Sequence, residues 1–310
     1  MSSNELQAWP VLKFDEFKHT VETVHLWSQI AGKVRLKAMP WLNHSWHVTL
    51  YVSPTGLTTG NIPFSRGSFQ IDMNFIDHEV VITSSEGRKQ WVKLYPRSVA
   101  SFYHELLLKL HEMDIDVKIY PRPNEVEPAI PFEQDHEHRE YNPAAMYNLW
   151  QALVRIEKVF TRFRSGFGGK CSPVHLFWGA FDLAVTRFSG KEAPVHPGGA
   201  PNIPLRVMQE AYSHEVSSAG FWPGNTQFPQ PVFYSYCYPT PDDFAIQPVE
   251  PQQAYFNKDM GEFMLAYDVV RQSADPEAML MQFLTSTYKA AAKTGNWDKG
   301  LECDLTYLEK

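Results

Sequence analysis

The feature that most constrains the fold is the grouping of short strand patterns between single helical patterns. Four strand patterns, HVTLYV, FQIDMNFI, EVVITS and QWVKLY, follow one another with no helical pattern between them. A helical pattern precedes them, with Val21, Val24 and Ile30 at helical spacing, and another follows from Ser98, which is typical of a helix cap. This order predicts an α+β protein with antiparallel strands rather than an alternating βαβ protein.

The second half of the chain follows the same order. Asn142 and Pro143 are typical of a helix start, and strand patterns follow at PVHLFW, FDLAVTRF, EVSSAGFW and VFYSYCYP. A final helix is predicted from Asp275 to just before Gly295. We therefore predict antiparallel sheets with flanking helices, in two loosely repeated helix–sheet–helix modules.

The modules have predicted bounds. Residues 1–120 form an N-terminal α+β module that ends in a short strand at DVKIY, and residues 142–310 form a C-terminal one. The proline-rich and charged segment 121–141 is predicted to connect them within one compact unit. Two proline-rich intervals, 189–206 and 223–261, are predicted to be long loops that wall a site.

Composition narrows the class of protein. The formal net charge is −7 without a basic stripe, so no binding to nucleic acid is expected. No apolar run approaches the ~18 residues of a membrane span, and no signal peptide is evident. Three widely spaced cysteines indicate a reducing compartment, so we predict a cytoplasmic protein that does not bind membranes. Nothing in the chain specifies an oligomeric state.

The first two strand patterns carry polar side chains suited to directed hydrogen bonds. Because side chains alternate along a strand, His47, Thr49 and Tyr51 share one face, and Asp72 lies on the polar face of the second pattern. We predict that these faces line a ligand-binding cleft; a merely solvated face is the alternative. His44 precedes the strand and is not expected to partner His47.

Two alternatives start from histidines. His47-Val48-Thr49 resembles the H-x-T strand motif of two-histidine phosphoesterases, but the second half offers only His175 and His214 without the matching hydroxyl. A metal-dependent hydrolase is the other alternative, because His175, His196 and His214 flank the second-half strands, although no diagnostic metal spacing is present. The metal and any other cofactor stay unspecified.

The catalytic prediction rests on the stretch AYSHEVSSAGFWPG, residues 211–224. We predict that His47 and His214 exchange protons and that Glu215 orients or assists them. Ser217 and Trp222 are expected to contact the ligand.

The strand FDLAVTRF adds polar groups on both of its faces. Asp182 and Thr186 share one face, and Arg187 lies on the other. An aspartate among small and aromatic residues is paired or functional, because an unpaired buried charge is costly. Asp182 and Arg187 are predicted to hold polar substrate groups or each other's loops, and Tyr234 is predicted to supply a wall. The alternative for Asp182 is a buried ion pair that ties the sheet to a loop.

Long strings of this sequence resemble a bacterial family catalogued as domain of unknown function 5996. KCSPVHLFWGAFDLAVTRFSG, HPGG and QEAYSHEVSSAGFWPG carry the resemblance in the second half, and NHSWHVTLYV and FQIDMNFIDH in the first. The resemblance covers nearly the whole chain and implies a single full-length unit. It implies no activity, substrate or cofactor.

These residues predict an enzyme of hydrolase or lyase type that acts on a small polar metabolite. A non-catalytic small-molecule binding protein is the second hypothesis. An interaction module is disfavoured, because the polar stretches suit a pocket lining better than a broad apolar patch.

Overall fold

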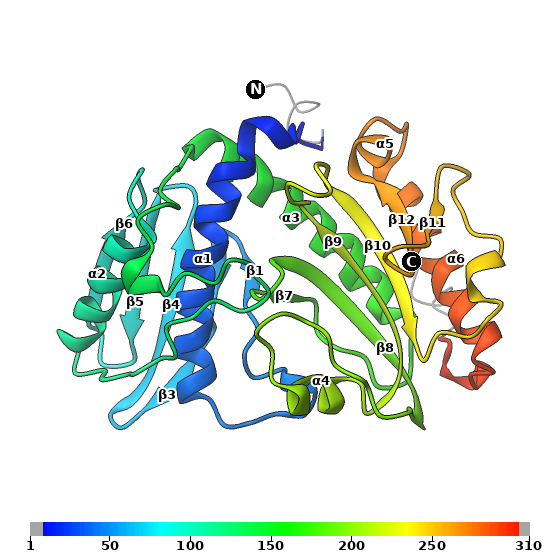
Figure 1. Ribbon diagram of the computed structural model, residues 1–310, viewed down its shortest axis with the longest axis horizontal. Helices are drawn as coiled ribbons and strands as arrows, with labels where there is room; N and C mark the ends of the chain where they lie inside the picture. Colours follow the sequence, from blue (N-terminus) through cyan, green and yellow to red (C-terminus); the bar gives the residue numbers. More distant parts are fainter. Residues whose placement is uncertain (1–8, 304–310) are drawn as a thin grey trace.

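Two six-stranded antiparallel sheets with flanking helices make up residues 9–303, which are the residues that the computed structural model describes (Figure 1). The first half supplies α1 (Phe14–Ala38), β1 (Tyr51–Ser53), β2 (Gly56–Thr58), β3 (Ile62–Phe64), β4 (Gly67–Asn74), β5 (Glu79–Ser84), β6 (Lys89–Lys93) and α2 (Val99–His111). The second half supplies α3 (Pro143–Ser165), β7 (His175–Phe177), β8 (Asp182–Glu192), α4 (Leu205–Ala211), β9 (His214–Trp222), β10 (Val232–Tyr238), β11 (Tyr255–Asn257), β12 (Glu262–Ala266), α5 (Tyr267–Arg271) and α6 (Pro276–Thr294). The α+β class predicted from the sequence is confirmed.

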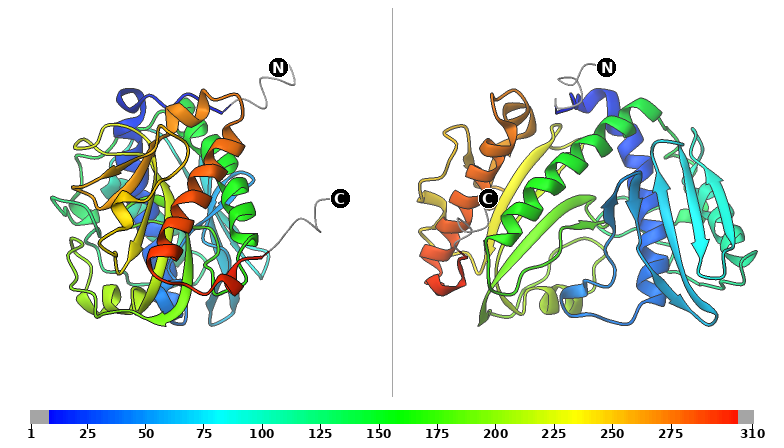
Figure 2. Two further views of the ribbon diagram at one scale, coloured as in Figure 1. Left: turned by 90° about the vertical axis from the view of Figure 1, so that its right-hand side faces the viewer. Right: turned by 180° about the vertical axis from the view of Figure 1, so that it is seen from behind.

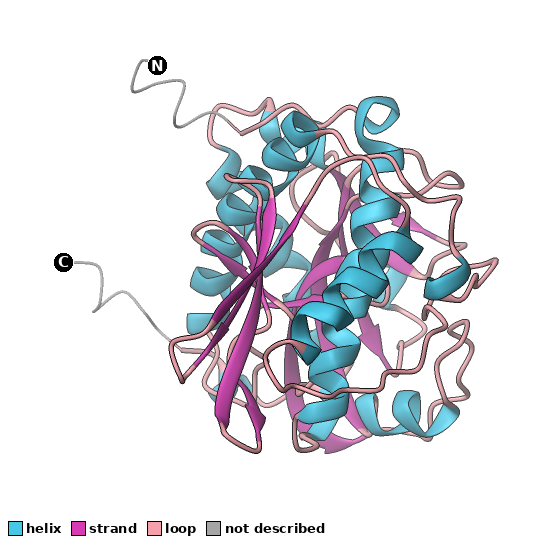
Figure 3. Ribbon diagram, turned by 90° about the vertical axis from the view of Figure 1, so that its left-hand side faces the viewer, coloured by secondary structure: helices cyan, strands magenta, loops and turns pink. Residues whose placement is uncertain are grey.

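The first sheet has the strand order β1-β2-β4-β5-β6, with β3 paired to β4. Its apolar face is the one predicted, since Phe69, Ile71 and Met73 of β4 are each 1% exposed. The helices α1 and α2 meet through stacked rings of Trp27 and Phe102, whose centroids lie 4.9 Å apart. Figure 3 shows α2 beside the strands of this sheet, on one side of the molecule.

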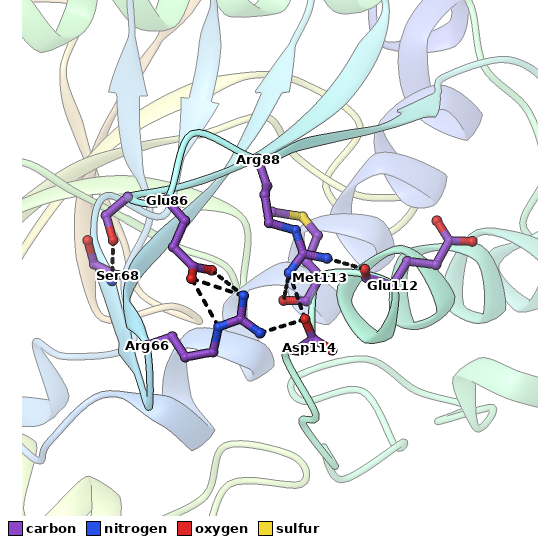
Figure 4. A network of polar contacts seen from close by, with 8 residues as sticks. Arg66, Ser68, Glu86, Arg88, Glu112, Met113 and Asp114 are labelled. Atoms are coloured by element: carbon purple, nitrogen blue, oxygen red, sulfur yellow. Dashed lines mark hydrogen bonds and ion pairs between the residues drawn. The ribbon is translucent and has the colours of Figure 1, made fainter.

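A polar network holds the β5–β6 turn against the end of α2 (Figure 4). Asp114 accepts a hydrogen bond from Arg66 and another from Arg88, both at 2.7 Å. Arg66 also donates to Glu86 in the turn, at 2.9 Å. These groups are exposed to water, so they orient the turn more than they stabilise the fold.

The second sheet has the strand order β11-β12-β10-β9-β8-β7. The helices α3 and α6 cover one of its faces, as the view from behind in Figure 2 shows. Leu183 and Val185 of β8, Phe221 of β9 and Phe233 of β10 are fully buried on this side. The opposite face carries the polar residues that form the candidate site.

The two sheets meet at one edge. Leu50, just before β1, and Leu176 of β7 exchange two backbone hydrogen bonds of 3.0 and 2.9 Å. We call this junction the seam. The helix α1 of the first half also packs on the second half, because Gly32 leaves room for the Trp178 ring, which a Cβ would approach to 2.3 Å.

One predicted strand starts later than expected. Within HVTLYV the paired strand begins only at Tyr51, and His47 and Thr49 lie in the preceding turn and extended segment. The chain turns at His44 and Ser45, both with φ of 57°, before it reaches the seam. The assignment of residues 47–49 to a strand face is therefore wrong.

Other elements also differ from the prediction. The segment 116–120, predicted as a strand, is irregular, and its apolar pattern reflects burial of Ile119 in the core. The interval 189–206 contains the end of β8 and the start of α4, while 223–261 contains β11 in addition to β10, the strand predicted at VFYSYCYP. A turn at Gly261, with φ of 72°, joins β11 to β12.

Candidate functional site

A group of carboxyl and phenol side chains lies on the face of the second sheet opposite α3 and α6. The strand register directs Asp182 and Thr186 of β8, Ser218 of β9, and Tyr234 and Tyr236 of β10 to this side. Glu125, Tyr212 and Glu262 join them from the covering segments and from β12. We call Asp182, Tyr234, Tyr236, Glu262, Glu125 and Tyr212 together the tyrosine–carboxyl face.

A glycine permits the central contact of this face. The Tyr234 ring lies over Gly220 of the neighbouring strand, where a Cβ would come within 2.3 Å of the phenol oxygen. The ring thereby reaches from β10 across β9, and its hydroxyl donates a hydrogen bond to the Asp182 carboxylate. Within residues 9–303 Asp182 forms no ion pair, so the alternative of a buried ion pair that ties the sheet to a loop is wrong.

A second pair of phenols lies beside the first. The hydroxyl groups of Tyr212 and Tyr236 are 2.8 Å apart, within hydrogen-bond distance. His196 stacks on Tyr212, with ring centroids 4.5 Å apart. The segment that connects β8 to β9 therefore covers the face with aromatic rings.

Glu125 reaches the face from the segment 121–141. Asn124 holds this segment to α1 through two hydrogen bonds of 2.8 Å with the Gln29 side chain. The Glu125 side chain lies against Gly179, where a Cβ would come within 2.0 Å of its carboxylate oxygen. In the described part of the chain, the carboxyl groups of Glu125 and Glu262 have no hydrogen-bond or ion-pair partner.

Burial raises the pKa values of all three acids, and the charge of Asp182 adds to this for the two glutamates. Burial raises the pKa of Asp182 to about 6, and the Tyr234 hydrogen bond opposes this. Burial, followed by the charge of Asp182, raises the pKa of Glu125 to about 7 and that of Glu262 to about 7. At neutral pH the three groups therefore exist in both protonated and ionised forms.

His44, Lys170, Glu210 and His214 form a second polar group at the lower end of β9. Lys170 donates a 2.6 Å hydrogen bond to Nε2 of His44, and the His44 backbone N–H donates one of 2.6 Å to Glu210. Because Nε2 of His44 accepts the hydrogen bond from Lys170, the ring proton is on Nδ1, which donates a 3.2 Å hydrogen bond to the Ala211 carbonyl. The ring centroids of His44 and His214 lie 6.1 Å apart. His44, which the sequence did not single out as a partner, is thus the histidine beside His214.

Four predicted residues gather around the seam instead of along one strand. Nδ1 of His47 accepts a 3.2 Å hydrogen bond from the Leu42 N–H, and the Thr49 hydroxyl donates one of 3.2 Å to the Trp46 carbonyl. The Tyr51 ring meets the fully buried His175 edge-on, at 5.5 Å between centroids.

The side chains of His214 and Glu215, the other two residues of the predicted catalytic group, point to opposite faces of the second sheet. Glu215 follows His214 in β9 and therefore projects to the opposite face. There it accepts a 2.8 Å hydrogen bond from the Ser189 hydroxyl. The structure therefore does not bring His47, His214 and Glu215 together as one group.

Four predicted ligand-binding residues have other surroundings. Arg187 and Ser217 lie on the helix side of the second sheet, where the Arg187 guanidinium is 3.6 Å from the Phe163 ring centroid. Asp72 belongs to the first sheet and accepts a 2.6 Å hydrogen bond from Gln70. Trp222 shares the side of Asp182 but packs on Phe228, at 6.0 Å between centroids.

Two surface hollows lie away from the tyrosine–carboxyl face. The larger, about 290 Å³, is lined by Asp15, Glu16, His19, Thr20, Pro96, Glu140, Tyr141 and Asn142. The smaller, about 30 Å³, lies between Glu215 and Trp297. Among residues 9–303, no three histidine, cysteine, aspartate or glutamate side chains are placed to share a metal ion.

Sequence reasoning missed four members of the face. Tyr236 had a usable signal, because it lies two residues from Tyr234 in one strand pattern and therefore on the same side. Glu262 follows an interval predicted as a loop, and Glu125 lies in the predicted connector. Tyr212 was hidden within a stretch interpreted through its histidine and serines.

The fold and this face define an α+β protein with two antiparallel sheets and a partly buried group of carboxyl and phenol side chains on one of them. The chain belongs to a family of unknown function (DUF5996), whose family model matches residues 9–303. The resemblance noted from the sequence is thereby confirmed. Comparison with curated proteins and with solved structures finds no match. In the part of the chain that the structure describes, no helix is both long and apolar enough to cross a membrane.

Proposed function

We propose that the protein binds a small polar molecule on the tyrosine–carboxyl face and catalyses a proton-transfer reaction on it, of hydrolase or lyase type. One observation carries the proposal: Glu125 and Glu262 each lie close enough to Asp182 to be affected by its charge, and no cationic side chain is paired with the three acids among residues 9–303. Carboxyl groups kept in such surroundings are more common at functional sites than elsewhere.

The proton affinities of these groups suit general acid–base catalysis. A catalytic acid or base works best when its pKa is near the working pH, and the three values lie between about 6 and 7. Tyr234 fixes the orientation of Asp182, which serves as the base. Glu125, brought over the sheet by the segment 121–141, serves as the acid.

The same groups define the ligand. Three carboxyl groups beside phenol and imidazole rings complement a positively charged or polyhydroxylated molecule, because carboxylates accept its hydrogen bonds and aromatic faces attract its cation. The stack of His196 on Tyr212 supplies such a ring surface.

A thermal-shift screen of small amines and polyols tests the proposal. Compounds that raise the melting temperature of the wild type are expected to lose this effect in Glu125→Gln and Glu262→Gln. Asp72→Asn, which alters an acid on the other sheet, is the matched control and is expected to keep it. If every stabilising compound acts equally on wild type and both glutamine variants, the face is not the binding site.

A non-catalytic binding protein is the second candidate, supported by the aromatic cover over the face. Proton NMR of each stabilising compound, incubated with the wild type, separates the two candidates. New signals that require Asp182 and Glu125 support catalysis. A compound recovered unchanged supports binding alone.

A further inference from the structure

A buried arginine at the seam lacks the acid that such a residue normally has. Arg35 of α1 is 6% exposed and forms no ion pair within residues 9–303. One guanidinium nitrogen donates to the Thr59 carbonyl, and the guanidinium also hydrogen-bonds the Tyr51 hydroxyl. The Arg35 Nε has no hydrogen-bond partner in the described chain. A buried cation in proteins is ordinarily paired, so Arg35 points to a missing anionic partner.

His175 adds a second unsatisfied group at the same place. It is fully buried, and neither of its ring nitrogens has a hydrogen-bond partner among the described residues. The rings of Trp46 and Tyr51 approach it edge-on, at 5.8 and 5.5 Å between centroids. Because buried polar atoms are nearly always hydrogen-bonded, an imidazole with two free nitrogens indicates an unseen partner.

Arg35, His175 and His47 are neighbours. The positive charge of Arg35 contributes to lowering the pKa of both histidines, after burial, which is the larger cause. The Arg35 guanidinium lies 5.7 Å from the Tyr51 ring centroid, and that ring contacts His175. Arg35 and His175 therefore both lie beside the Tyr51 ring at the seam, and His47 is close enough to feel the Arg35 charge.

The nearby acid does not balance this group. Glu210 acts electrostatically on His47; one of its oxygens accepts from the His44 backbone N–H at 2.6 Å, and the other is buried with no hydrogen-bond partner among the described residues. Lys170, whose side chain is exposed, adds a further positive charge beside Trp46, 5.3 Å from a Trp46 ring centroid. The excess charge at the seam is positive.

We infer that the seam binds an oxyanion, the phosphate or carboxylate group of a small molecule, between Arg35, His175 and His47. The guanidinium offers a planar pair of donors that matches such a group, and each imidazole offers one N–H. Trp46 and His47 lie in a turn rather than a strand, and entry of an anion requires this turn to shift. The inference is independent of the acid–base proposal, because none of these residues belongs to the tyrosine–carboxyl face.

The other buried arginines show why Arg35 is distinctive. Arg97 is paired with Glu105. Arg187 also has a free Nε, but rings of Phe163 and Tyr288 lie against its guanidinium, with centroids at 3.6 and 4.3 Å. Aromatic faces occupy the space that an anion would need, which makes Arg187 a matched control.

The test is an NMR titration of the full chain with inorganic phosphate and, separately, with acetate, at constant ionic strength held by chloride. His175→Phe identifies the His175 imidazole signals by their loss. In the wild type these signals are expected to shift and saturate. Arg35→Gln is expected to weaken binding by at least about 30-fold, whereas Arg187→Gln keeps the wild-type affinity.

The outcomes separate the ligand classes. Saturation by phosphate alone assigns a phosphate site, saturation by acetate alone assigns a carboxylate site, and saturation by both assigns a general oxyanion site. If neither anion gives a saturable shift, or if Arg35→Gln and Arg187→Gln weaken binding equally, the inference is overturned. Should Arg35→Gln fail to fold, Arg35→Lys and His47→Gln replace it, each with a weaker but measurable affinity expected.

Discussion

At the scale of single residues, the tyrosine–carboxyl face depends on the missing side chain at Gly220. Alanine at this position would place a Cβ within 2.3 Å of the Tyr234 hydroxyl oxygen. The ring would move, and the Asp182 carboxylate would lose its hydrogen bond. We expect Gly220→Ala to lower the free energy of unfolding by about 1 to 3 kcal/mol, measured by urea denaturation.

A double-mutant cycle supplies the control. Tyr234→Val removes the ring that occupies the space over Gly220, so the alanine should cost much less in that background. Equal costs in both backgrounds would show that Gly220 is required for a reason other than Tyr234.

The three acids of the face also predict how stability depends on pH. Their pKa values in the folded protein lie between about 6 and 7, whereas carboxyl groups of unfolded chains titrate near 4. Between these limits the folded protein binds more protons than the unfolded chain. The contribution of these groups to the free energy of unfolding therefore falls as the pH rises from about 4 to about 7.

The variant Glu262→Gln isolates the contribution of one of these carboxyl groups to the pH dependence of stability. The variant is expected to match the wild type near pH 4 and to exceed its free energy of unfolding at pH 8 by on the order of 2 kcal/mol. The quantity to compare is the difference in free energy of unfolding between variant and wild type, because buried histidines change the stability of both proteins with pH in the opposite direction. Burial lowers the pKa of His25 to about 4, so its contribution rises with pH over part of the same range.

The exposed Glu192 provides the comparison for this measurement. Glu192→Gln is expected to change the free energy of unfolding little at either pH. A Glu262→Gln variant less stable than wild type at pH 8 would mean that its carboxylate is stabilised by a partner.

At this scale the sequence was informative about faces and uninformative about distant neighbours. Strand alternation placed Asp182 and Thr186 on one side and Arg187 on the other, and the register confirms it. The approach of His44 to His214, or of Glu125 to Asp182, depends on the path of the whole chain. No local pattern encodes such contacts.

At the scale of secondary-structure elements, helix starts were the most predictable features. Asn142 accepts hydrogen bonds from the Ala144 and Ala145 N–H groups, at 3.0 and 3.2 Å, as its position before a proline suggested. Ser98 and Asp275 cap α2 and α6 in the same way. Capping is a local interaction, so the chain encodes it within four residues.

The cap of α3 gives a direct test. Asn142→Ala is expected to lower the free energy of unfolding by about 1 kcal/mol, because two N–H groups lose their acceptor. Asn148→Ala, the same change at an exposed position inside α3, is the matched control and should be neutral or slightly stabilising. Similar losses for both variants would show that the cap contributes nothing.

Strand bounds were less predictable, and the reason is tertiary. The β-branched pattern at 47–52 is real, but pairing starts only at Leu50, where the chain meets β7. The short strands β2, β3 and β11 have three residues each, too few for an alternating pattern to be distinct.

At the scale of the whole molecule, the seam decides whether the two halves act as one. Its backbone pair joins residues 126 positions apart in sequence, Leu50 and Leu176, both almost fully buried. Trp178 extends the contact, since its ring lies against Gly32 of α1 and its indole N–H donates a 2.7 Å hydrogen bond to the Val48 carbonyl. The α+β class could be predicted from element order, but this junction could not, because nothing local marks either partner.

The junction predicts a single cooperative unfolding transition for both sheets. Hydrogen exchange of the β4 and β9 amides, followed by mass spectrometry, should report equal opening free energies near the global value. Leu176→Ala is expected to lower both by about 2 to 5 kcal/mol, because it leaves a cavity where the sheets meet. Leu108→Ala, at an exposed position of α2, should change neither by more than about 0.5 kcal/mol. If Leu176→Ala lowers the value for β9 while that for β4 stays unchanged, the sheets unfold independently and the halves are separate domains.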